Sequence, residues 1–203
     1  MIERHLMGRD ITDPQVIRAM EDVPREEFVE PSLRDFAYDD NPLPIGHGQT
    51  ISQPYIVALM IQELRPKAGD KALEIGAGSG YQAAVLSRVV KHVYTIEIIK
   101  ELADSAAARL ERLGYDNVSV LCADGYEGWI DEAPFDKIIG AAAVGEIPSP
   151  LEAQLKEEGR IIIPVGYSFA QELMLGVKRG GEVHYRPVTA VRFVPMTGKA
   201  EEL

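Results

Sequence analysis

The sequence lacks a second cysteine, a long apolar run and a secretion signal. Cys122 is the only thiol among 203 residues, so no internal disulfide can form and a reducing compartment is expected. Every apolar run falls well short of the roughly 20 residues that span a bilayer. The opening MIERHLMGRD carries charges from its third residue instead of a basic flank and an apolar core. We therefore expect a soluble cytoplasmic protein without a membrane partner.

Basic clusters, metal-ligand spacing and a nucleophile elbow are absent as well. Lys and Arg number 21 against 32 Asp and Glu, giving a net charge of −11, and no basic patch offsets the repulsion of a phosphate backbone. The four histidines are scattered, so no metal site is expected. Ser79 lies between Ala77 and Tyr81 rather than between the glycines of a hydrolase elbow. Nucleic-acid binding, a metal centre and serine hydrolase chemistry are therefore disfavoured.

Short apolar runs that alternate with helical segments make up most of the chain after residue 70. This alternation is typical of βαβ units and predicts a mainly parallel sheet flanked by helices. The expected strands cover 71–77, 92–98, 118–124, 135–143 and 160–166, and the expected helices cover 81–90, 100–114 and 150–159. Two further apolar runs, 171–178 and 182–196, flank a glycine-containing turn, which predicts an antiparallel C-terminal hairpin.

The N-terminal part is irregular by comparison. Asp13 and Pro14 form a good start for a helix to Asp22, after which four prolines interrupt the segment before residue 45. Residues 50–64 then show apolar positions at helical spacing, with Ser52 as a candidate cap. A chain of this length suffices for one α/β domain. We expect a single domain over 1–203, with a helical appendage and loop at 1–50 and the core at 51–203.

The stretch LEIGAGSGY, residues 73–81, places three glycines directly after the first expected core strand. In an open α/β sheet, ligands bind beyond the carboxyl ends of the strands, and glycines there let a ligand approach the backbone. A dinucleotide fingerprint would need a glycine where Tyr81 stands. The spacing therefore disfavours NAD and favours S-adenosylmethionine, a cofactor without phosphates.

Acidic residues follow the successive strands where such a cofactor needs them. Glu97 can accept hydrogen bonds from ribose hydroxyls, Asp124 can accept one from the adenine amino group, and the charge of Glu74 suits an ammonium or sulfonium group. Taken singly, these features also fit a tight loop, a surface acid and a helix cap. The predicted cofactor-binding residues are Glu74, Gly76, Ala77, Gly78, Ser79, Gly80, Glu97, Asp124 and Gly125.

Several blocks resemble the protein-L-isoaspartate O-methyltransferases among the class I methyltransferases. They are QTISQPYIVALM (49–60), ALEIGAGSGY (72–81), CADGYEG (122–128), APFDKIIGAAAVGEIP (133–148), LKEEGRIIIPVG (155–166) and RFVPMTG (192–198). The chain departs from the family in lacking a second glycine near Glu158. Eukaryotic relatives also carry a histidine where this chain has Val57. The resemblance implies a Rossmann-like three-layer α/β sandwich and S-adenosylmethionine as cofactor.

The implied reaction is repair of damaged proteins. The enzyme would methylate the free α-carboxylate of L-isoaspartyl residues, and whether D-aspartyl residues are also substrates stays open. The ester would close to a succinimide that reopens partly as normal aspartate. Damaged proteins and peptides are the expected partners, and a monomer is expected.

By motif match, Ser52 is the catalytic residue. Because a substrate carboxylate with a pKa of ~3.5 is already ionised at neutral pH, no general base is needed, and the serine hydroxyl is expected to orient the carboxylate. A helix cap is the competing role for Ser52. The predicted substrate-binding residues are Thr50, Ile51, Ser52, Gln53, Ala142, Ala143 and Val144.

Two other functions stay open at this level. One is a class I methyltransferase that acts on RNA or a small molecule, which the acidic charge and the TISQP block respectively disfavour. The other is a module that binds S-adenosylmethionine without methyl transfer. The position of Ser52 relative to the glycine turn distinguishes this module from an enzyme.

Overall fold

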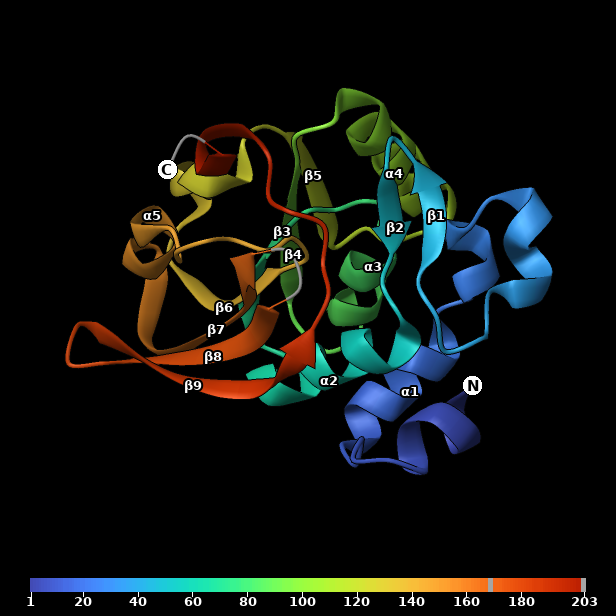
Figure 1. Cartoon of the computed structure of the whole chain (residues 1–203), viewed down its shortest axis with the longest axis horizontal. Helices are drawn as coiled ribbons and strands as arrows, with labels where there is room; N and C mark the ends of the chain where they lie inside the picture. The colour runs from blue at the N-terminus through green and yellow to red at the C-terminus, as the bar shows by residue number, and fades with distance from the viewer. Residues whose placement is uncertain (168–169, 202–203) are drawn as a thin grey trace.

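In the computed structural model, which describes residues 1–167 and 170–201, a seven-stranded sheet forms the centre of the molecule (Figure 1). Its strand order is β5-β4-β3-β6-β7-β8-β9. The strands are β3 (Lys71–Ile75), β4 (His92–Glu97), β5 (Val118–Cys122), β6 (Phe135–Gly140), β7 (Leu155–Tyr167), β8 (Ala170–Arg179) and β9 (Glu182–Val191). Strands β3 to β7 pair in parallel, while β8 pairs antiparallel with both β7 and β9. The predicted mainly parallel sheet and C-terminal hairpin are therefore confirmed.

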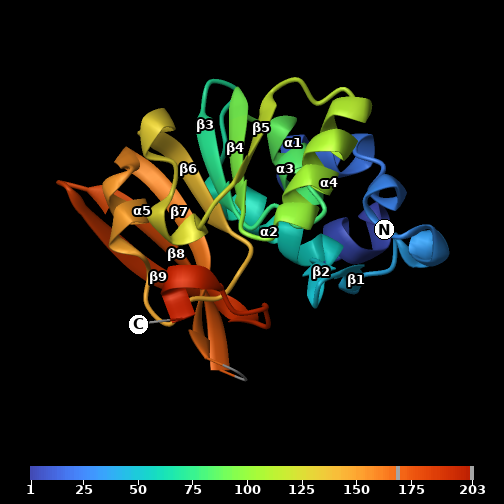
Figure 2. The same ribbon diagram turned by 90° about the horizontal axis from the view of Figure 1, so that it is seen from above.

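Helices cover both faces of this sheet (Figure 2). They are α1 (Pro14–Asp22), α2 (Pro54–Leu64), α3 (Tyr81–Ser87), α4 (Lys100–Arg112) and α5 (Ser149–Ala153), with α1 to α4 on one side and α5 on the other. Short 3-10 helices cover Arg25–Phe28, Pro31–Phe36, Gly125–Glu127, Ile130–Glu132 and Gly198–Glu201, and a π-helical turn covers Ile2–Met7. The molecule therefore has three layers, as predicted.

The alternation of side chains along the strands divides the core between these layers. Ile139 and Ile162 pack in the core beneath α1 to α4, whereas Ile138 and Ile161 pack in the core on the α5 side. Successive residues of a strand point to opposite faces, so a sheet that is buried on both sides needs continuous apolar runs. This requirement explains the runs KIIG and RIIIP.

The sequence predicted some elements more accurately than others. Helix α1 begins after Asp13, whose side chain accepts a hydrogen bond from the Gln15 amide at 2.8 Å, as expected. The helix predicted over 150–159 is wrong in its second half, because β7 already begins at Leu155. Leu155 is buried and pairs with Phe135 of β6, which holds this segment extended despite its helical composition.

A small hairpin in the N-terminal part was not predicted. Strands β1 (Leu43–Gly46) and β2 (Gln49–Ile51) pair antiparallel ahead of α2. The prolines of this segment concealed the strands from the sequence pattern. Residues 168–169 and 202–203 of the expected core lie outside the described residues, and the division of the domain at residue 50 stays a prediction.

The amino end of α2 is capped from a distance. The helix begins at Pro54, so the expectation that Ser52 caps it is wrong. Instead, Asp40 accepts hydrogen bonds from the Tyr55 amide at 3.1 Å and from the Gln53 side chain at 2.7 Å. A carboxylate at this position satisfies an otherwise unpaired helix donor and interacts favourably with the helix dipole. The contact leaves the Ser52 side chain available for another role.

Removal of this cap is expected to destabilise the protein. Asp40→Ala should lower the free energy of unfolding by about 1 kcal/mol, the usual cost of a lost side-chain cap. The neighbouring Asp39, which is exposed, provides the control substitution Asp39→Ala with the same charge change. Urea denaturation of both variants measures the difference, and equal stabilities would contradict the capping role.

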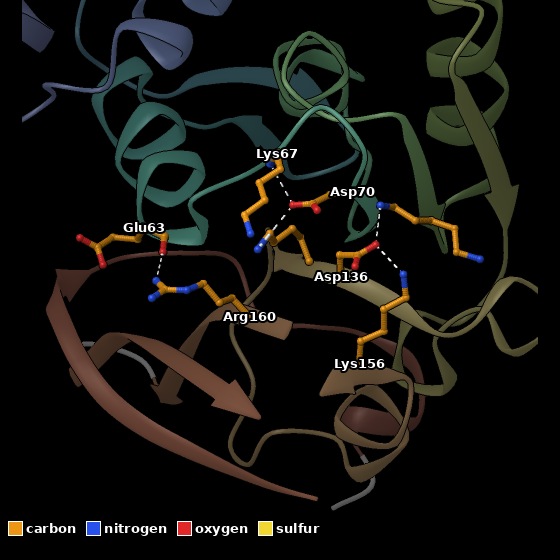
Figure 3. Close-up of polar contacts among 8 residues, drawn as sticks. Glu63, Lys67, Asp70, Asp136, Lys156 and Arg160 are labelled. Carbon is orange, nitrogen blue, oxygen red and sulfur yellow. Dashed lines mark hydrogen bonds and ion pairs between the residues drawn. The ribbon is translucent and has the colours of Figure 1, made fainter. Parts of the chain in front are cut away.

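Charged side chains close the opposite, amino-terminal edge of the sheet (Figure 3). Asp136 accepts hydrogen bonds from the Lys71 amide and from the Lys156 ammonium, both at 2.8 Å. Lys137 and Asp70 form a largely buried ion pair at 3.5 Å. These contacts fix the starts of β3 and β6 at the end away from the glycine turn.

No helix in the described part of the chain is long and apolar enough to cross a membrane.

Candidate active site

A cavity opens at the carboxyl ends of β3, β4 and β6, and we call it the main cleft. It is lined by residues 49–52, 75–79, 96–99, 141–142 and 194–197 together with Val57, Tyr81, Gln82 and Gly125. The glycine turn, the end of β4 and the loop before α2 therefore surround one space. This is the edge of an open α/β sheet at which ligands bind.

The three glycines of the turn adopt backbone conformations that other residues avoid. Gly76, Gly78 and Gly80 have φ values of +92°, +53° and +86°, in the region where only glycine is free of a steric penalty. The amides of Gly76 and Ala77 both donate to the Ile96 carbonyl, at 2.8 and 3.1 Å, so the turn is fixed against β4. Gly76 to Ser79 line the main cleft, whereas Gly80 is the N-cap of α3 and packs against Leu110.

Glu97 joins the end of β4 to this turn. One carboxylate oxygen accepts a hydrogen bond from the Gly78 amide at 2.8 Å, and the other accepts one from the Ile99 amide at 3.0 Å. The residue is only 6% exposed and lines the main cleft. Each oxygen retains a lone pair, so the carboxylate can still accept bonds from a ligand's hydroxyl groups.

Glu74 lies behind the turn rather than in the lining of the main cleft. Its side chain is fully buried and accepts a hydrogen bond from the Thr95 hydroxyl at 2.5 Å, while its second oxygen has no partner among the described residues. Burial raises the pKa of the Glu74 carboxyl to about 8, and the neighbouring Thr95 and Gln82 side chains partly oppose this rise. A substantial fraction of Glu74 is therefore protonated at neutral pH in the unliganded protein.

The raised pKa predicts a pH dependence of stability. An unfolded carboxyl titrates near 4.5, so the unfolded chain releases its proton first and stability falls as the pH rises from about 4.5 towards 8. At alkaline pH, wild type should have lost on the order of a few kcal/mol of its free energy of unfolding, and Glu74→Gln should not show this loss. Urea unfolding of the unliganded protein at several pH values measures this, with Glu101→Gln on the exposed face of α4 as control. Parallel pH profiles for wild type and Glu74→Gln would refute the assignment.

Ser52 lies where the main cleft meets a second hollow. This outer groove is lined by residues 42, 50, 52–53, 56, 141 and 190–194, so Thr50 and Ser52 line both spaces. Within the described residues the Ser52 hydroxyl has no hydrogen-bond partner. Ile51 and Gln53 flank it, the first in the main cleft and the second in the outer groove. The four residues predicted from the TISQP block are thus assembled at one junction.

Known proteins share these features over nearly the whole chain. A model of the family described as protein-L-isoaspartate(D-aspartate) O-methyltransferase matches residues 1–201. Protein-L-isoaspartate O-methyltransferase 2 of Nitrosococcus oceani is 56% identical over 201 residues, covering 98% of this chain and 92% of that one. The chain belongs to the protein-L-isoaspartate O-methyltransferase family.

Solved structures of this family have the same fold. A protein-L-isoaspartate O-methyltransferase superposes with a TM-score of 0.88 at 31% identity, covering 98% of this chain and 67% of that one. A beta-aspartate methyltransferase from Plasmodium falciparum, solved with S-adenosyl-L-homocysteine, gives a TM-score of 0.82 at 28% identity and covers 97% of this chain and 96% of its own. The predicted fold class and family are therefore confirmed.

In this family member, Asp124 caps the 3-10 helix Gly125–Glu127, the alternative role that the sequence left open, and it also contacts the C-terminal segment. One carboxylate oxygen accepts a bond from the Tyr126 amide at 2.9 Å and the other accepts one from the Lys199 amide at 2.8 Å. Asp124 does not line the main cleft, although Gly125 does. It fastens the C-terminal segment to the loop after β5, and its proposed contact with adenine stays a prediction.

The loop after β6 is paired with that C-terminal segment. The Ala143 amide donates to the Val194 carbonyl at 2.8 Å, and the Met196 amide donates to the Ala143 carbonyl at 2.7 Å. Ala142 lines the main cleft, whereas Ala143 and Val144 line a further hollow, the second groove, formed with residues 42, 50, 145, 166–167, 171, 192–196 and 200–201. The three predicted substrate residues of this loop thus divide between the main cleft and the second groove.

Two parts of the lining were absent from the predicted site residues, although the first lies in the family block 192–198. Residues 194–197 form one wall of the main cleft, and Gln82 lines it from the first turn of α3. The position of the C-terminal wall depends on long-range pairing that no local pattern reveals. Gln82, however, is a polar residue within the apolar run YQAAVL, and this interruption was a usable signal.

Proposed function

We propose that the main cleft binds S-adenosylmethionine and that the outer and second grooves bind the damaged protein segment, with Ser52 between them. The observation that carries this assignment is that Thr50 and Ser52 line both the main cleft and the outer groove. A donor in one space and a carboxylate in the other meet at these residues. The chain thereby performs the reaction of its family, methylation of isoaspartyl residues in proteins.

The lining of the main cleft fits this donor. Glu97 would hold the ribose, because each of its oxygens has one backbone donor and spare acceptor capacity. Ile96, Ile98 and Met196 offer apolar surface to the adenine. Gly125 leaves space beside Ile75, because a Cβ at position 125 would lie only 2.4 Å from the Ile75 side chain. When bound, S-adenosylmethionine supplies the methyl group.

The chain's contribution to catalysis is then alignment rather than proton transfer. A free α-carboxylate with a pKa of ~3.5 is already an anion at neutral pH. Among the described residues, none forms a hydrogen bond with the Ser52 hydroxyl that could activate it as a nucleophile, so this hydroxyl donates a hydrogen bond that fixes the carboxylate. Correct alignment in a site of this kind contributes up to about 7–11 kcal/mol to lowering the barrier.

The substrate is an extended polypeptide segment. The outer groove includes Ala190 and Val191 of β9, the edge strand of the sheet, and an edge strand can bind an extended peptide. Further parts of the proposal are that D-aspartyl residues are also methylated and that the protein works as a cytoplasmic monomer. Nucleic acid and membranes are not proposed as partners, because the net charge of −11 disfavours anionic surfaces.

A pair of synthetic peptides that differ only in isoaspartyl or aspartyl linkage tests the function. With methyl-labelled S-adenosylmethionine, we expect base-labile label in the isoaspartyl peptide alone. Equal labelling of both peptides, or none of either, would contradict the proposal. Binding of S-adenosyl-L-homocysteine without any labelling would instead indicate a module that retains the cofactor without transfer.

A further inference from the structure

Gln82 carries a buried amide with no partner. The residue lies in the first turn of α3, is 7% exposed and lines the main cleft. Neither its nitrogen nor its oxygen has a hydrogen-bond partner among the described residues. Leaving buried polar atoms unpaired is costly, and native proteins rarely do so. An amide that lines a ligand cleft and lacks partners in the protein points to a partner in the ligand.

The surroundings of Gln82 show which of its atoms needs that partner. One oxygen of the neighbouring Glu74 is also buried and unpaired, while its other oxygen accepts the Thr95 hydroxyl. A bond from the Gln82 amide nitrogen to the ionised form of Glu74 would satisfy two of these three unpaired atoms. The amide oxygen of Gln82 would remain, and it is an acceptor that requires a donor.

The charges of the cleft identify the kind of donor. None of the described residues that line the main cleft is Lys, Arg or His, whereas the acidic Glu97 lines it. A cationic group is therefore favoured over an anionic one. The amino-acid portion of S-adenosylmethionine carries such a group, its ammonium.

We propose that Gln82 accepts a hydrogen bond from the ammonium of the cofactor's amino-acid portion, with Glu74 behind it holding the amide in position. The inference rests on the proposed function, since it takes the main cleft to be the cofactor site. It assigns to Gln82 the recognition of one chemical group rather than of the whole cofactor. Ligands that lack this group should therefore be insensitive to the side chain at position 82.

Binding measurements with three ligands test the assignment. Gln82→Met keeps the length of the side chain but removes the amide. It should weaken the binding of S-adenosyl-L-homocysteine by about 10-fold to 100-fold, which is the effect of losing one hydrogen bond to a charged group. Two ligands without the ammonium should bind to this variant as tightly as to wild type. They are the deaminated analogue of S-adenosyl-L-homocysteine, which ends in a carboxylate alone, and 5′-methylthioadenosine. Isothermal titration calorimetry on the full chain gives all dissociation constants.

The control and the contrary outcomes separate this inference from the function. Ser87→Ala, at the far end of α3, removes a side-chain bond to the Ala84 carbonyl outside the cleft and should leave all affinities unchanged. An equal loss for all three ligands in Gln82→Met would show a structural role for Gln82, and no loss for any would show no role; either result overturns the inference. Failure of wild type to bind S-adenosyl-L-homocysteine would overturn the proposed function instead.

Discussion

Glu97→Ala should weaken binding of S-adenosyl-L-homocysteine by at least about 100-fold, because two hydrogen bonds from ribose hydroxyls to a charged acceptor are lost. The same substitution also removes the acceptor of the hydrogen bonds that the Gly78 and Ile99 amides donate to Glu97 at 2.8 and 3.0 Å. The turn that carries the cofactor would then lose its attachment to the end of β4. Both effects act on affinity, so we expect the dissociation constant to change far more than any rate constant at saturating cofactor.

Calorimetric titration of the purified variant measures this loss. Glu101→Ala, an exposed acid near the start of α4 with the same charge change, is the matched control and should bind as wild type does. Glu97→Gln should fall between them, since its amide keeps one acceptor oxygen. If a folded Glu97→Ala protein bound the ligand normally, the cofactor would have to lie elsewhere.

Ser52→Ala should lower kcat by about 10-fold to 100-fold and leave the affinity for S-adenosyl-L-homocysteine unchanged. The hydroxyl lines the junction of the two spaces and has no partner in the described protein. A hydrogen bond to a charged group is worth about 1.5–3 kcal/mol, and its loss in the aligned complex raises the barrier by a similar amount. The helix start does not depend on Ser52, because Asp40 caps it.

Steady-state kinetics on an isoaspartyl peptide, together with cofactor titration, separates the two effects. Ser52→Thr, which keeps a hydroxyl, should retain more activity than Ser52→Ala, and Ser32→Ala on an exposed 3-10 helix should retain all of it. An unchanged kcat in Ser52→Ala would remove the serine from the reaction. A parallel loss of cofactor affinity would instead indicate a role in forming the main cleft.

The sequence predicted what depends on neighbouring residues. The start of α1 follows from the adjacent Asp13 and Pro14, and the glycine turn follows from backbone conformations that only glycine adopts freely. The joining of Glu97 to this turn follows from the topology, because β3 and β4 are adjacent parallel strands whose carboxyl ends meet.

What the sequence could not predict depends on contacts between distant residues. Asp40 caps α2 across 15 positions, and Asp124 binds the Lys199 amide across 75. The Asp40 contact replaces the expected cap at Ser52. Asp124 accepts hydrogen bonds from two backbone amides and does not line the main cleft. The sequence near Asp40 or Asp124 does not identify its distant partner, so these contacts can be recognised only in the folded structure.

The C-terminal wall of the main cleft constrains how the enzyme is made. Residues 194–197 close the cavity, and Ala143 pairs with this segment only when it is present. The ribosome synthesises this segment after every strand of the sheet, since β9 ends at Val191, so a nascent chain can form the sheet centre before it has a finished binding site. A stop codon shortly before residue 194 should therefore give a protein that keeps the strands of the sheet but lacks one wall of the main cleft and binds S-adenosyl-L-homocysteine far more weakly.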